Sequence, residues 1–157
     1  MTSSLVIGKH THQHNSVGVS AHLLSPEDIP YVWEDIEPLL AKVSKHTEGE
    51  MLPEDFMTPL EEGLMQLWVA IEEKNIVAVM VTQIVPYPQK KILRVIAIAG
   101  SDFKGLHARF NDIIEGFAVR VGCSSMELWG RKGWKKLLPD WKDSYIVYTK
   151  DIKSRMQ

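Results

Sequence analysis

The residues best suited to chemistry gather at positions 129–136. They read Trp-Gly-Arg-Lys-Gly-Trp-Lys-Lys, with four cations and two indole rings. Stacking on the indoles, combined with ionic contacts to the cations, would hold an adenine ring and a phosphate, or a nucleic-acid or protein surface. The alternative, which we favour, is a cationic, solvated helix face with both indoles buried, because Lys and Arg side chains readily stay exposed.

Three histidines and a single cysteine are further candidates. His10, His12 and His14 alternate, so an extended chain would place their rings on one side, but no nearby Cys or carboxylate completes a metal site. We therefore predict no metal, and a flexible polar arm over residues 1–16. Cys123 has no second cysteine to pair with, so nothing demands an oxidising compartment. We expect it to be a free, buried thiol rather than a nucleophile.

Composition excludes several classes of protein. The chain has 157 residues, 45% of them hydrophobic, which suits one domain with its own core; we place it at residues 17–152, followed by a tail at 153–157. Eighteen basic and 20 acidic residues give a net charge of -2, which argues against a nucleic-acid partner. No apolar segment long enough for a membrane span or a secretion signal is visible, so we expect a cytoplasmic protein.

Hydrophobic periodicity predicts an α/β fold, with a mixed sheet of about six strands flanked by helices. Apolar residues at three- and four-residue steps predict helices at 29–45 and 106–121, with short helices near 52–60 and 131–138. Strands are expected at 17–24, 67–71, 76–82, 92–99, 125–129 and 145–149. The helix after the strand at 92–99 indicates a crossover, which makes strands 92–99 and 125–129 parallel neighbours.

This order of elements resembles the GNAT acyltransferase fold over residues 17–152. Three segments, QLWVA at 66–70, LRVIAIAG at 93–100 and GRKGWKKLL at 130–138, look like a GNAT-like group encoded by tailed phages and prophages. That group is similar to the small internal virion protein of short-tailed phages. The resemblance implies a GNAT fold and a phage context, with the protein in the cytoplasm of a bacterial host or packaged in the virion.

The resemblance also implies a site for acetyl-CoA. In GNAT proteins, backbone groups of the strand before the long helix hold the pantetheine arm and stabilise the oxyanion, and the following turn binds the pyrophosphate. By position, the residues that would hold the arm are Val95, Ile96, Ala97, Ile98 and Ala99. The phosphate turn would run from Gly100 to Leu106.

The phosphate turn departs from the family motif, Gln/Arg-x-x-Gly-x-Gly/Ala. In the closest frame, which begins at Asp102, only Gly105 matches, and His107 occupies the second Gly/Ala position. An Asp102 carboxylate that capped the helix would occupy the amides that a phosphate needs and would repel its charge. Against this, Lys104, His107 and Arg109 could hold a phosphate through their side chains. The sequence leaves both readings open.

Candidates for proton transfer are few. Glu127, on the strand parallel to 92–99, could deprotonate an ammonium through water. The alternative, which we favour, is that Glu127 faces solvent or pairs with Arg131. The short helix after this strand lacks the tyrosine that GNAT enzymes often use as the acid for the leaving thiolate. Tyr145 and Tyr148 could substitute only if the cleft reaches the last strand.

Two functions follow from these residues. The first is acetyl-CoA-dependent N-acetylation of an amine on a small molecule or a host protein. The second is a non-catalytic role, in which a degenerate GNAT scaffold serves as a virion component or binds a phage or host protein. The altered turn at 102–107 weakens the first reading and favours the second.

Overall fold

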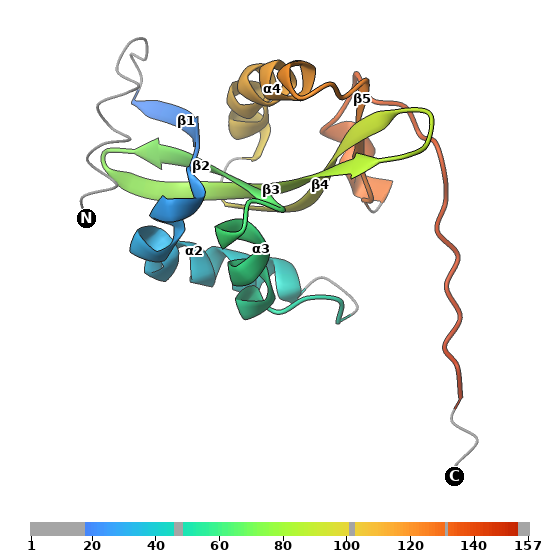
Figure 1. The fold of residues 1–157 in the computed structure, drawn as a ribbon, viewed down its shortest axis with the longest axis horizontal. Helices are drawn as coiled ribbons and strands as arrows, with labels where there is room; N and C mark the ends of the chain where they lie inside the picture. Colours follow the sequence, from blue (N-terminus) through green and yellow to red (C-terminus); the bar gives the residue numbers. More distant parts are fainter. Residues whose placement is uncertain (1–17, 46–48, 101–102, 131, 154–157) are drawn as a thin grey trace.

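A computed structural model describes residues 18–45, 49–100, 103–130 and 132–153. Five strands form one sheet in the order β1-β2-β3-β4-β5. Figure 1 shows α4 on one face of this sheet and α2 with α3 on the other. This three-layer arrangement confirms the predicted α/β fold, with five strands instead of about six. Within the described ranges, no helix is long and apolar enough to span a membrane.

The N-terminal part supplies an edge strand and the helices of one face. Strand β1 (Val19–Leu23) leads into a 3-10 turn, η2 (Pro26–Asp28), and helix α2 (Ile29–Ser44). Helix α2 buries the predicted stripe: Ile29, Val32, Ile36 and Leu40. A second 3-10 turn, η3 (Pro53–Phe56), and the short helix α3 (Met57–Glu61) complete this layer. Both helical predictions in this part are confirmed.

The three central strands form an antiparallel meander. Strand β2 (Gln66–Glu72) pairs with β3 (Asn75–Pro86), which pairs with β4 (Lys91–Gly100). Glu73 and Lys74 join β2 to β3 with φ values of 51° and 70°, as a two-residue hairpin turn requires. Strand β3 runs farther than predicted and ends at Pro86. Proline has no N–H to donate, but at the last position of the strand this does not interrupt the pairing of the residues before it.

Helix α4 and strand β5 form the predicted crossover. Helix α4 (Phe103–Arg120) ends where Gly122 adopts φ 85°, which lets the Cys123 N–H reach back to the Ala118 carbonyl at 2.8 Å. Strand β5 (Ser125–Leu128) then pairs with β4 in parallel, as predicted. A 3-10 helix, η4 (Lys132–Lys136), replaces the predicted short helix at 131–138.

Two apolar cores lie on opposite faces of the sheet. The first joins α2 and α3 to inward-facing strand residues, among them Leu67, Val69, Val79, Val81 and Ala97. The second packs α4 through Phe110, Ile114 and Ala118 against Trp68, Ala70, Met80 and Leu93. Because neighbouring residues of β2 and β3 face different cores, the stretches 67–71 and 76–81 are apolar throughout and show no polar alternation.

The predicted last strand at 145–149 is wrong. This segment is extended but lies outside the sheet, and Tyr145 and Tyr148 are 90% and 87% exposed. Figure 1 shows the chain running away from the body of the protein here. The residue types favour strand, but a strand also needs a neighbour, which this segment does not have within the described chain.

Candidate functional site

The parallel pair β4 and β5 separates partway along β4. The paired residues run from Ile92 opposite Ser125 to Val95 opposite Leu128, and β4 continues to Gly100 without β5 beside it. The separation coincides with a β-bulge, since Val81 and Thr82 pair with Ala97 and Val95, which leaves Ile96 as the extra residue. Beyond Val95, β4 therefore has a strand on its β3 side only, among the described residues.

A pocket lies at this separation, on the α4 side of the sheet. Its lining is almost entirely apolar and consists of Met80, Val95, Ile98, Phe110, Asn111, Ile114, Met126, Leu128, Leu138 and Trp141. These residues come from β3, β4, α4, β5 and the chain around η4. The pocket thus adjoins the unpaired edge of β4, where backbone groups and apolar side chains are available together.

The residues predicted to hold the pantetheine arm all lie on β4 at the bulge and beyond. Val95 and Ile98 face the second core, whereas Ile96, Ala97 and Ala99 face the first. The bulge sets this pattern, because Ile96 and Ala97 point to the same side. Gly100 ends the strand with φ 143°, and helix α4 begins at Phe103.

The phosphate turn itself is described only in part. The backbone of α4 from residue 103 onward is helical, which includes Lys104, Gly105, Leu106, His107 and Arg109. The side chains of Lys104, Leu106, His107 and Arg109, and Ser101 and Asp102 entirely, lie outside what the structure describes. Whether Asp102 caps the helix therefore stays a prediction.

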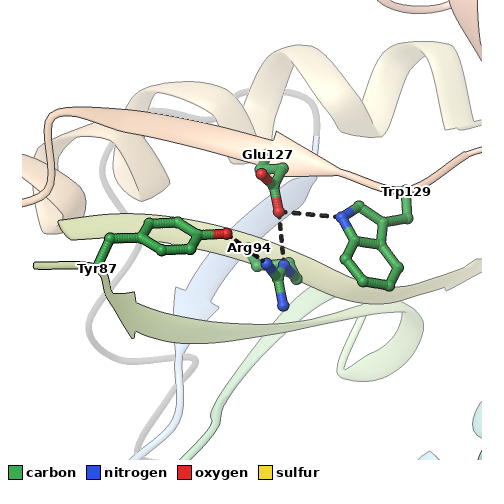
Figure 2. Close-up of polar contacts among 4 residues, drawn as sticks. All are labelled: Tyr87, Arg94, Glu127 and Trp129. Carbon is green, nitrogen blue, oxygen red and sulfur yellow. Dashed lines mark hydrogen bonds and ion pairs between the residues drawn. The ribbon is translucent and has the colours of Figure 1, made fainter. Parts of the chain in front are cut away.

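A polar cluster occupies the other face of the sheet where β4 and β5 run together (Figure 2). The Arg94 Nε donates to Glu127 Oε1 at 2.7 Å, and an Arg94 Nη donates to the Tyr87 hydroxyl at 3.0 Å. The Trp129 Nε1 donates to the same Glu127 oxygen at 3.0 Å, and the Arg94 guanidinium carbon lies 4.6 Å from the centre of the Trp129 ring. These contacts tie β5 to β4 one residue before they separate.

The cluster is accessible to solvent but ordered by several contacts. The Arg94 and Glu127 side chains are 20% and 30% exposed, so their ion pair stabilises the fold by about 1 kcal/mol at most. Both described hydrogen bonds to Glu127 end on Oε1. The second carboxylate oxygen, Oε2, is therefore the acceptor that a water or an ammonium could reach.

The predicted pairing of Glu127 with Arg131 stays a prediction, because Arg131 lies outside the described residues. Among the described residues, Glu127 forms an ion pair with Arg94. Sequence reasoning missed Arg94 and Tyr87 as members of this site. A signal was present, because Arg94 is the only charge within the apolar run from Ile92 to Ala99. A charge in a largely buried strand needs a partner, although only the register of β4 and β5 identifies it.

The cationic segment at 129–136 fits neither reading fully. Trp134 is half-buried, but Trp129 is 65% exposed, so the prediction that both indoles are buried is wrong for Trp129. Trp129 stays outside the core because its N–H and ring contact Glu127 and Arg94 at the edge of the sheet. Lys135 and Lys136 are exposed, as the solvated-face reading predicts.

The remaining candidates lie apart from this cluster. Tyr145 is 90% exposed on the extended C-terminal segment, so the single chain does not bring it to Glu127. The three histidines of the N-terminal arm lie outside the described residues. Within the part that is described, no three His, Cys, Asp or Glu side chains gather closely enough to hold a metal ion.

Cys123 is half-buried at the end of α4. Partial burial raises the pKa of its thiol, and the positive charge of Lys91 opposes this shift. Since the thiolate is the reactive form, we expect iodoacetamide to alkylate Cys123 more slowly in the folded protein than in urea at neutral pH. The rate should also rise with pH around a higher midpoint in the folded protein. A midpoint equal to or below that of the unfolded chain would contradict this prediction.

Comparison with known proteins places the fold. No family model matches the chain, and no curated protein matches its sequence. An aminoglycoside acetyltransferase from an uncultured soil metagenomic sample, solved with sisomicin, superposes with a TM-score of 0.66 at 13% identity, covering 87% of this chain and 98% of that one. A GNAT family acetyltransferase from Staphylococcus aureus gives 0.62 at 16% identity, with coverage of 86% and 99%.

A predicted acetyltransferase from Clostridium acetobutylicum, solved with acetyl-CoA, gives a TM-score of 0.63 at 13% identity, covering 85% of this chain and 96% of that one. Because almost the whole of each solved structure is matched, the likeness extends over the complete fold. The protein is therefore a single-domain α/β protein with the GNAT fold.

Proposed function

We propose that this protein is an acetyl-CoA-dependent N-acetyltransferase that acts on a primary amine. The observation that carries the proposal is the separation of β4 from β5 at Val95 and Leu128, next to an apolar pocket and followed by the N-terminus of α4. An unpaired strand edge offers backbone N–H and C=O groups, and a helix N-terminus favours an anion. Proteins of this fold solved with acetyl-CoA and with an aminoglycoside support the same substrate classes.

Residues of this chain would hold two parts of the cofactor, the pantetheine arm and the pyrophosphate. Backbone groups at Ile96, Ala97, Ile98 and Ala99 would hold the pantetheine arm along the free edge of β4. The first turn of α4, with Gly105, would take the pyrophosphate, assisted by the side chains of Lys104, His107 and Arg109. Acetyl-CoA supplies an acetyl group activated as a thioester.

Glu127 is the residue we assign to proton transfer. Its Oε2 would accept a proton from the incoming ammonium through a water, which leaves the amine nitrogen with a free electron pair for attack. Arg94 and Trp129 would hold the carboxylate in place through Oε1. The amide forms as the thioester bond breaks, and a proton must then reach the departing thiolate. Tyr145 is the candidate acid that the sequence offers, but in the single chain it lies outside the sheet and would need a second copy to bring it to the site.

Calorimetric titration with acetyl-CoA tests the cofactor site. We expect micromolar binding by the natural protein and at least about a tenfold weaker binding by Gly105→Glu, because the new carboxylate would obstruct and repel the pyrophosphate. Gly116→Glu is the matched control, since it makes the same change in the same helix, where an added Cβ has ordinary space. Absence of heat at millimolar ligand would overturn the enzymatic proposal.

Kinetics of the Glu127→Gln variant test the proton transfer. Once an amine substrate is known, we expect kcat to fall on the order of a hundredfold with little change in the KM for acetyl-CoA, because glutamine keeps the size but cannot accept the proton. Glu115→Gln, an exposed glutamate on α4, is the control. An unchanged kcat in Glu127→Gln would mean that Glu127 does not transfer the proton and only links β5 to β4 through its contact with Arg94.

A non-catalytic role is the second candidate, favoured by the apolar side chains that the C-terminal segment leaves in solvent. In this case the fold would act as a scaffold in a phage particle or against a phage or host protein. The phage context rests on the resemblance of residues 66–70, 93–100 and 130–138. Mass spectrometry of particles purified from a phage whose genome encodes this chain tests the virion role. Detection of the chain in the particles would support that role, and its absence from them would contradict it.

A further inference from the structure

The C-terminal segment exposes more apolar surface than a free chain end requires. Every residue from 142 to 153 is exposed, and Tyr145, Tyr148 and Ile152 are 90%, 87% and 88% accessible. Figure 1 shows the segment extended and pointing away from the sheet. Large contiguous apolar surface that is exposed on a protein is typical of an interaction site.

The sequence of this segment is that of a strand buried on both faces. Residues 145–149 read Tyr-Ile-Val-Tyr-Thr, and each of these residue types is enriched in strands. Apolar or aromatic side chains would point to both sides of the extended backbone. Such a strand needs a sheet edge with which it can pair, and it needs other side chains to cover both of its faces.

An edge with matching properties is present in the same chain. Strand β5 lies at the edge of the sheet, and β4 is its only strand neighbour in the described structure. Natural proteins cover or blunt such edges, because unpaired N–H and C=O groups recruit further strands. On one side of this edge, Met126 and Trp141 are only partly buried; on the other, Trp129 is 65% exposed. An added strand beside β5 would cover both sides.

The chain leaves its own sheet from a fixed point. Leu138 is buried, and Trp141 packs on the second core while its N–H donates to the Leu138 carbonyl at 3.1 Å. Pro139 stiffens the connection between them. Beyond Trp141, residues 142–153 at about 3.3 Å each reach about 40 Å, which is far enough to enter a neighbouring molecule.

We propose that two copies of this protein exchange their C-terminal segments, so that residues 145–149 of each copy pair with β5 of the other. Each chain supplies one free strand and, at β5, an edge for it to pair with, so a two-fold arrangement satisfies both copies at once. Four buried tyrosines contribute about 600 to 1,000 Å². With the isoleucines and valines, the interface reaches the size of specific protein contacts.

The exchange has a consequence for the site. It places Tyr145 of the second copy beside β5, which is the strand that carries Glu127. Within one chain, by contrast, Tyr145 lies outside the sheet. The exchange itself is independent of acetyl transfer, since it depends only on strand pairing and apolar burial.

The mass of the full chain in solution, measured by light scattering across micromolar concentrations, tests the exchange. We expect a dimer, and we expect Val147→Pro to raise its dissociation constant by at least about tenfold, because proline removes a ladder donor in both exchanged strands. Lys153→Pro, outside the exchanged residues, should leave the constant within about twofold. Since Val147 is 58% exposed in the single chain, its replacement should not unfold the monomer.

Cross-linking identifies which edge accepts the strand. Chains carrying Ser125→Cys and differently tagged chains carrying Val147→Cys, both with Cys123→Ala, should give a mixed product with a short bis-maleimide. A further variant carries both new cysteines in one chain. If a cross-link forms only within this variant and not between differently tagged chains, the segment returns to its own β5, and the exchange is overturned. A monomeric natural protein, or a dimer that survives Val147→Pro unchanged, would overturn it as well.

Discussion

Replacing Gly100 by alanine should destabilise the protein by about 3 to 5 kcal/mol. A Cβ at this position would lie 2.4 Å from the Cβ of Ala78 and 2.7 Å from the Val77 carbonyl oxygen. The φ of 143° adds strain, because residues with a side chain rarely adopt it. Urea unfolding followed by tryptophan fluorescence measures the loss.

Two companion variants separate the causes of that loss. Gly63→Ala also has a positive φ, 77°, but this value is near the left-handed helical region and the space around the added Cβ is open, so it should cost only about 1 kcal/mol. Adding Ala78→Gly to Gly100→Ala removes the nearest of the clashing atoms, although the Val77 carbonyl oxygen remains close, and should recover part of the stability. Equal costs for Gly63→Ala and Gly100→Ala would show that β3 and β4 are not in close contact at this point.

A contact this close has a reason in the fold. Gly100 pairs with Ala78 across β3 and β4, at the end of the strand and just before α4 begins. Small residues on both strands let the two backbones approach, and the chain then turns toward the helix N-terminus. We therefore expect any variant of Gly100 that still folds to bind acetyl-CoA more weakly, because the turn after β4 would move.

Replacing Trp68 by alanine should cost about 3 to 5 kcal/mol. The ring is 1% exposed and meets Phe117 of α4 edge-on, with 5.4 Å between the ring centres. Its Nε1 donates to the Thr82 hydroxyl at 2.9 Å, and that hydroxyl donates to Gln66 Oε1 at 2.8 Å. Truncation would remove the packing between sheet and helix and leave the buried Thr82 without a donor. Thermal or urea unfolding would measure the change.

The buried hydrogen bond can be measured separately from the packing. Thr82→Val should cost about 1 to 3 kcal/mol, because it leaves the indole N–H buried without an acceptor. In a Trp68→Phe background, the same replacement should cost much less, since the N–H is already gone. If Thr82→Val costs the same in both backgrounds, the polar chain does not contribute to stability in the way that its geometry indicates.

The helices and central strands could be predicted because their burial patterns are local. In α2, Ile29, Val32, Ile36 and Leu40 lie on one helical face, and any fold must cover that face. The uninterrupted apolar runs of β2 and β3 likewise require layers on both sides. The crossover through α4 then determined that β4 and β5 are parallel neighbours.

The candidate site was predicted only in outline. The resemblance placed acetyl-CoA along residues 95–100, which lie at the point where β4 and β5 separate. Arg94 and Glu127, by contrast, are 33 residues apart in sequence and meet only through the register of those strands. A shift of one residue in this register would turn one of the two side chains to the other face.

The sequence by itself determined the order and type of most elements, because helical and strand periodicity follow from which face each segment must bury. Tertiary structure alone decided the β-bulge at Ile96, the pairing of Arg94 with Glu127, and the position of residues 145–149 outside the sheet. Each of these depends on which strand edge is within reach. Local residue preferences are the same whether a strand pairs within its own chain, with another copy, or with no partner.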